Sequence, residues 1–84
     1  MDRISITKHT SKGLHTIYFQ VVPESPQKSV VYSNTQLNDE AVEPVCVIVR
    51  DNPGMTYNKS AYERAVDRAH SMIAEYLTEG YIII

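Results

Sequence analysis

The side chains that could do chemistry are few: one cysteine and three histidines. Cys46 lies within the apolar run Val45–Val49, where a thiol behaves as an inert small hydrophobic group rather than as a thiolate nucleophile. Together with His9, His15 and His70 it matches no standard zinc spacing. The three glycines are isolated, whereas a phosphate-binding loop needs several near a strand end. We therefore expect no metal, no cofactor and no enzymatic activity.

Basic residues suggest one binding chemistry. Lys8 and Lys12 lie close together near the start of the chain, with Arg3 before them and Lys59 much later. Such side chains contact phosphates, so a nucleic-acid-binding domain is the alternative function. The formal net charge of −2 disfavours this alternative, because most nucleic-acid binders carry a basic excess.

Acidic residues suggest a second binding chemistry. Asp39, Glu40 and Glu43 fall within five positions of an expected loop. Carboxylates gathered in this way either meet a basic partner surface or remain a solvated loop. We count the three among the residues of a protein interface.

The chain is expected to be one domain over residues 1–84, because two domains would leave each half without a workable core. A hydrophobic fraction of 43% with 21% charged residues is ordinary for a globular protein. A single cysteine and a start without the pattern of a secretion signal favour the cytoplasm. The apolar runs are too short to cross a membrane, so no membrane partner is expected.

Four strands are expected before any helix. Arg3–Thr10 begins with alternating apolar and polar residues, and His15–Val22 is rich in β-branched and aromatic residues, so the two should form a hairpin. Pro23–Pro26 should interrupt the ladder. Ser29–Gln36 is more polar, which is typical of an edge strand. Val45–Val49 is apolar on both sides, which predicts a strand in the middle of the sheet.

One long helix and a last strand follow. Ser60 and Glu63 match a capping box, which predicts a helix that starts there and ends before Gly80. His70 falls at the boundary between the core face and the polar face of this helix. Tyr81–Ile84 is expected to form a short strand that pairs with the sheet of its own chain or with that of a second copy. The core face is expected to hold Tyr62, Ala65, Val66, Ala69, Ile73, Tyr76 and Leu77.

These elements predict an α+β fold in the order β-β-β-β-α-β. A mostly antiparallel sheet of four to five strands would pack one face on the helix. If Phe19, Val21, Val47 and Val49 face the helix, the other face carries Tyr18, Val22, Cys46 and Ile48.

That second face leaves two interpretations open. An uncovered apolar patch marks an interface with a protein partner or with a second copy in a homodimer. Alternatively, the sheet curls and its loops cover the patch. Tyrosines are enriched at interfaces, and Tyr18, Tyr32, Tyr57 and Tyr81 are those not assigned to the helix.

The sequence thus predicts a small protein-binding module: a regulator, inhibitor or adaptor, a class that includes phage-encoded inhibitors of host machinery. The expected interface residues are Tyr18, Val22, Tyr32, Asp39, Glu40, Glu43, Ile48 and Tyr81. In the nucleic-acid alternative the contacts come instead from Arg3, Lys8, Lys12 and Lys59.

Overall fold

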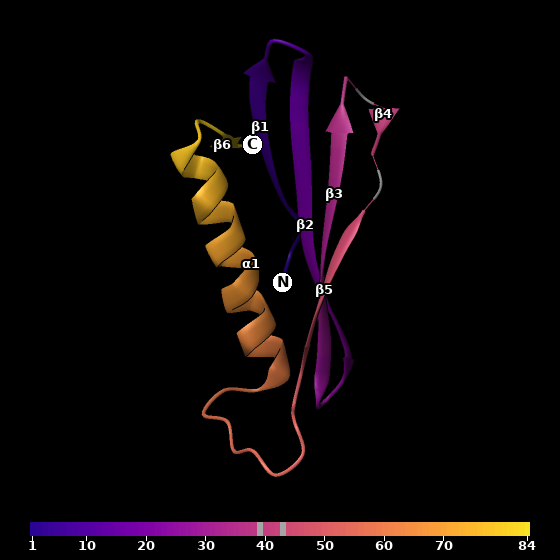
Figure 1. Cartoon of the computed structure of the whole chain (residues 1–84), viewed down its shortest axis with the longest axis vertical. Helices are drawn as coiled ribbons and strands as arrows, with labels where there is room; N and C mark the ends of the chain where they lie inside the picture. The colour runs from indigo at the N-terminus through magenta and orange to yellow at the C-terminus, as the bar shows by residue number, and fades with distance from the viewer. Residues whose placement is uncertain (39, 43) are drawn as a thin grey trace.

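One antiparallel sheet and one helix make up the part of the chain that the computed structural model describes, residues 1–38, 40–42 and 44–84. The helix runs along one face of the sheet, and no described helix covers the other face (Figure 1). The predicted α+β class is confirmed. In chain order the elements are β1 (Ile4–Thr10), β2 (Gly13–Ser25), β3 (Lys28–Leu37), β4 (Glu40–Ala41), β5 (Val45–Arg50), α1 (Ala61–Thr78) and β6 (Ile82–Ile83).

The strands run in the order β4-β3-β2-β1-β6, and β5 pairs with β3 beside β4. β3 is therefore a central strand with partners on both sides, and β5 is paired only to β3 among the described residues. The sequence predicted the reverse arrangement, with β5 in the middle and β3 at the edge, and both predictions were wrong. The terminal strand β6 pairs with β1 of its own chain.

Side-chain size explains why β3 holds the centre. Ser29 and Ser33 are buried on the helix side, where small residues let the helix approach closely. The bulkier Tyr32 and Asn34 lie on the other face. The polar residues of β3 are therefore compatible with a central strand, because the small ones fit beneath the helix and the larger ones lie on the opposite face.

The β2–β3 hairpin extends beyond the predicted end of the second strand. β2 continues through Pro23 to Ser25, and the pairing with β3 shifts register between these two residues. Such an irregularity accommodates a proline, which has no N–H to donate to the ladder. Pro23 therefore lies at an irregularity within the hairpin, and Pro26 lies in the turn that follows β2.

Both ends of α1 are capped by local hydrogen bonds. The Ser60 hydroxyl accepts from the Glu63 backbone N–H at 3.1 Å, and the Glu63 carboxylate accepts from the Ser60 N–H at 3.4 Å, which confirms the capping box. Gly80 adopts φ +98°, and the Tyr81 N–H donates to the Tyr76 carbonyl at 3.3 Å. This closing pattern needs the left-handed conformation that glycine adopts without strain.

The buried face of α1 is lined mainly by small residues. Ala61, Ala65 and Ala69 have no exposed surface, and Ile73 is nearly buried, so the helix packs closely on the sheet. Leu77, predicted to be in the core, is 38% exposed. The helix is not both long and apolar enough to cross a membrane, and it is the only one among the described residues.

The core forms two adjoining clusters beneath the helix. One is built around Ile6, Ile17, Phe19, Ile73 and Tyr81. The second holds Val21, Val31, Ala65 and Ala69, with Val47 and Val49 of β5 packed against it. Met1 and Met72 contact both clusters and join them. Both clusters therefore lie on the helix side of the sheet, and this arrangement fixes which residues face the other side.

Candidate functional site: the open face of the sheet

The face of the sheet opposite α1 is the candidate site, and we call it the open face. Side chains alternate along a strand, and Phe19, Val21, Val47 and Val49 all pack on the helix side. The register then assigns the intervening residues to the other side, as the sequence predicted. The open face comprises Thr16, Tyr18, Gln20 and Val22 of β2, Val30, Tyr32, Asn34 and Gln36 of β3, and Cys46 and Ile48 of β5.

One end of the open face is apolar. Val22, Val30 and Ile48 lie directly opposite one another across three strands. Val30, in the centre of this row, is 4% exposed, whereas Ile48 at its outer end is 57% exposed. Cys46 is also exposed. The described loops therefore leave the outer part of this patch uncovered, and the row offers a ready contact for an apolar side chain.

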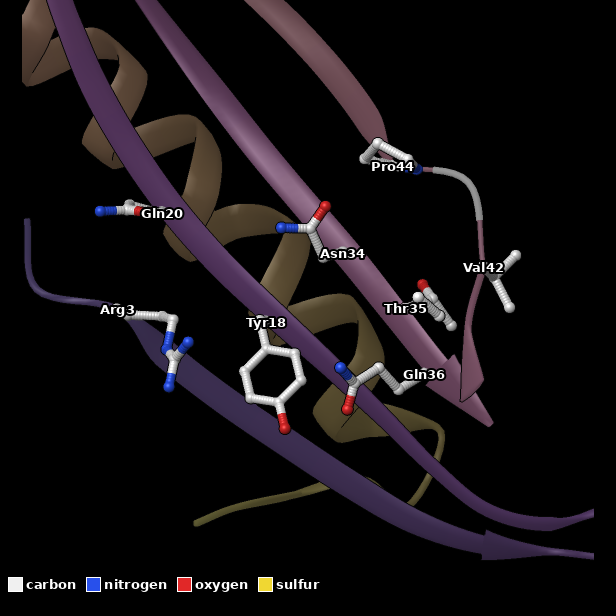
Figure 2. Close-up of a pocket in the computed structure, with 9 residues that line it drawn as sticks. Arg3, Tyr18, Gln20, Asn34, Thr35, Gln36, Val42 and Pro44 are labelled. Atoms are coloured by element: carbon white, nitrogen blue, oxygen red, sulfur yellow. The ribbon is translucent and has the colours of Figure 1, made fainter. Parts of the chain in front are cut away.

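The other end of the open face is a polar pocket of about 350 Å³. Figure 2 shows the Tyr18 ring and the Arg3 guanidinium on one side of it, with the Asn34 and Gln36 side chains extending from β3. The guanidinium carbon of Arg3 lies 4.8 Å from the centre of the Tyr18 ring, within the range of a cation–π contact. The full lining is Arg3, Tyr18, Gln20, Asn34, Thr35, Gln36, Ala41, Val42 and Pro44.

The polar side chains of this pocket make few contacts with the rest of the described chain. Among the hydrogen bonds formed within the described residues, none engages the side chains of Arg3, Tyr18, Gln20, Asn34 or Gln36. A guanidinium binds carboxylates in two-pronged fashion, and amides both donate and accept, as a peptide backbone requires. The pocket can therefore bind an acidic group and the peptide units beside it.

Thr7 and Thr16, on the same face as the pocket, differ from its lining because their hydroxyls are hydrogen-bonded within the protein. The hydroxyls of Thr7 and Thr16 lie 3.2 Å apart and hydrogen-bond to each other, and the Thr7 hydroxyl also donates to the His15 carbonyl. These groups satisfy one another within the protein. The amide side chains that form no hydrogen bonds among the described residues therefore line the pocket, next to this satisfied pair.

The structure brings together four of the eight predicted interface residues. Tyr18, Val22, Tyr32 and Ile48 share the open face. Glu40 is exposed in β4, whose other residue, Ala41, lines the polar pocket. Asp39 and Glu43 lie outside the described residues.

Tyr81 is not part of this surface, contrary to the prediction. It is 9% exposed and lies in the core on the helix side, with its ring centre 5.2 Å from that of Tyr76. Its hydroxyl reaches Nδ1 of His15. Burial raises the pKa of the Tyr81 hydroxyl, with smaller contributions from Tyr76 and Glu79. The glycine before it turns the chain back onto the sheet, which the apolar C-terminal sequence alone did not reveal.

The four basic residues of the nucleic-acid alternative do not share one surface. Arg3 lies at the pocket, and Lys12 lies at the tip of the first hairpin. Lys8 donates to the Glu79 carbonyl at 2.5 Å, at the end of α1. Lys59, before the start of α1, donates to the Asp67 carboxylate at 2.7 Å, which raises the pKa of Lys59. A continuous track for a phosphate backbone is therefore not formed by these four side chains.

Sequence reasoning missed the amides of the pocket. Gln20, Asn34 and Gln36 are individually unremarkable polar residues in strands. Only Gln20 alternates with apolar residues, whereas Asn34 and Gln36 lie in a polar stretch. The β2–β3 register shows that the three gather around Tyr18. His70, predicted at a face boundary, is exposed, and the described residues hold no cluster of three or more His, Cys, Asp and Glu side chains suited to a metal.

Comparison of the chain with protein-family models, with curated proteins and with solved structures found no match in any of the three. The geometry of the open face therefore carries the functional conclusion.

Proposed function

We propose that this chain is a non-enzymatic module that binds another protein through the open face of its sheet. One observation carries the proposal: an apolar row that ends at the exposed Ile48 adjoins a pocket of polar side chains that form no hydrogen bonds among the described residues, on the face that the helix leaves uncovered. Protein interfaces combine such an apolar centre with polar groups around it.

The chemistry of the face suggests what it binds. Val22 and Ile48 offer a contact for an apolar side chain of the partner, and Arg3 offers a guanidinium for a carboxylate. The amides of Gln20 and Asn34 lie between these two regions and suit the backbone of an extended segment. The fitting partner therefore presents an apolar residue and an acidic one near each other on an exposed segment.

A domain of this size that binds without catalysis acts by occupying a surface of its partner. We propose a role as a regulator, inhibitor or adaptor. The exposed carboxylate of Glu40, next to the pocket, would select against acidic surroundings in the partner. The free and exposed thiol of Cys46 suits a reducing compartment, so we propose that the chain acts in the cytoplasm.

Affinity capture from a lysate of the source cells, read by mass spectrometry, tests this function. The tag belongs at the C-terminus, because Met1 packs against both core clusters and its amino group contacts the Tyr62 hydroxyl, whereas Ile84 is 68% exposed. The wild type is compared with Ile48→Asp, which places a charge in the apolar row. The matched control is His70→Asp, which adds the same carboxylate at an exposed position of α1.

Open-face binding predicts a protein partner that survives nuclease treatment, that is lost with Ile48→Asp and that is kept with His70→Asp. A second variant, Arg3→Ala, should weaken capture because the pocket loses its only cation among the described lining residues. A partner retained equally by all variants would place the binding surface elsewhere. Recovery of nucleic acid, with binding that weakens steeply as salt increases, would instead support the alternative function.

A further inference from the structure

The outer edge of β5 has no strand beside it in the part of the chain that the structure describes. Among the described residues β5 pairs only with β3, so the backbone groups on its other side lack ladder partners. Proteins usually protect such an edge with lysine, proline or a covering segment, because it pairs readily with another strand. Within Val45–Val49 there is no charged residue and no proline, and Arg50 closes the strand. The edge is therefore open to pairing.

The side chains on this edge are apolar and exposed on both faces. Ile48 on the open face and Val45 on the helix side are each 57% exposed, and Cys46 is exposed as well. A strand that is apolar on both faces is typical of a position inside a sheet. That pattern led to the prediction of a central strand. A neighbouring strand on the outer side would give β5 the surroundings that its sequence fits.

We propose that two copies of this chain pair through β5, antiparallel and about a two-fold axis, to form one continuous sheet. Facing residues in an antiparallel pair point to the same side. If the axis passes at Val47, Cys46 faces Ile48 of the second copy and Val45 faces Val49 of the second copy. Every facing pair from Val45 to Val49 is then apolar, and both helices lie on the same side of the joined sheet.

A second copy fits this edge better than an unrelated strand. A two-fold interface requires that one surface complement itself, and the alternating apolar residues of β5 meet that condition in the register just described. Moving the axis to Ile48 would instead set Cys46 against Arg50 of the second copy. The uncharged centre also means that pairing two identical strands brings no like charges face to face. The joined sheet would carry two open faces side by side.

The pairing should be weak. Six residues of strand edge bury less than the ~1,600 Å² of a standard interface. The main stabilisation comes from the new backbone ladder and from the apolar pairs beside it. We therefore expect monomers and dimers to exchange, with half-dimerisation at a protein concentration in the micromolar range.

Sedimentation equilibrium across micromolar to sub-millimolar concentrations tests the proposal on the purified chain. The mass should rise with concentration from 9.5 kDa to twice that value. Val45→Lys should keep the protein at the monomer mass, because each lysine would face Val49 of the second copy and put a charge into an otherwise apolar pair. Met55→Lys adds the same charge at a residue that is 60% exposed in the connection before α1, and it should dimerise as the wild type does.

Crosslinking through Cys46, the single cysteine, provides a second readout that needs no variant. In the proposed register the two thiols are diagonal neighbours, with residues about 7–8 Å apart, within reach of a short bis-maleimide. We expect a covalent dimer in the wild type and in Met55→Lys but not in Val45→Lys. A constant monomer mass without crosslinked dimer would overturn the proposal, as would a dimer that Val45→Lys leaves intact. Val45 is not on the open face, and no partner is needed, so the two proposals can fail separately.

Discussion

Ser29 provides a sharp test of how the helix packs on the sheet. It has no exposed surface, and its hydroxyl finds no hydrogen-bond partner among the described residues. It lies on β3 between Pro23 and Val49 on the side covered by the helix. A buried hydroxyl without a partner costs about 1–3 kcal/mol of desolvation. Ser29→Ala removes that cost and should stabilise the fold.

The expected gain is smaller than the full desolvation cost. Alanine loses the contacts of one oxygen, each worth about 0.1–0.2 kcal/mol, and alanine is itself disfavoured in strands. We therefore expect the free energy of unfolding to rise by about 1 kcal/mol. For a domain of this length that is a rise in Tm of roughly 4–8 °C.

Urea unfolding followed by circular dichroism measures the change in midpoint at constant slope. Ser33→Ala is the control, because Ser33 lies on the same strand and the same face but keeps 9% of its surface exposed. It should change the free energy of unfolding by less than about 0.5 kcal/mol. A loss of stability in Ser29→Ala of about 1 kcal/mol or more would refute the reasoning, because the hydroxyl would then be satisfied in the folded state.

Two further predictions concern the ends of α1. Ser60→Ala removes the capping box and should lower the free energy of unfolding, measured in urea, by about 1 kcal/mol. The control Ser71→Ala, at an exposed position within the helix, should leave the free energy of unfolding unchanged or slightly higher. Equal effects of the two substitutions would show that the cap contributes nothing. The pKa of Tyr81 is raised above 10.0 in the folded protein, so as the pH rises the unfolded chain loses the phenol proton before the folded chain does. The contribution of Tyr81 to the free energy of unfolding is therefore fully present below pH 10.0 and is lost as the pH rises through the folded-state pKa. Urea midpoints on either side of pH 10.0 should therefore fall less in Tyr81→Phe than in the wild type, and equal falls would contradict this origin.

Local signals in the sequence were sufficient where a few neighbouring residues decide the structure. The capping box at Ser60 and Glu63 fixed the helix start, and Gly80 marked its end. The alternation in β2 and β5 correctly separated Phe19 from Tyr18 and Val47 from Ile48. Each of these depends on contacts within one turn or one strand. The fold class and the two faces of the sheet could therefore be predicted.

Long-range pairing could not be predicted in the same way. An apolar strand such as β5 is compatible with a central position and with an edge that meets another surface, and hydrophobic pattern alone does not separate the two. Serines at 29 and 33 resembled an edge strand because the closeness of the helix, which requires small residues there, is not visible locally. The polar pocket depends on the register that brings Asn34 beside Tyr18, so its amides emerged only from the structure.

The central claim is that the open face binds a protein partner, and the most direct measurement is NMR shift mapping of the labelled chain with the captured partner. We predict that the largest changes occur at the methyl groups of Val22 and Ile48 and at the backbone of Tyr18 and Asn34, with little change at His70 on the exposed side of α1. Changes concentrated on α1 or on the tip of the first hairpin, with the open-face signals unmoved, would contradict the claim.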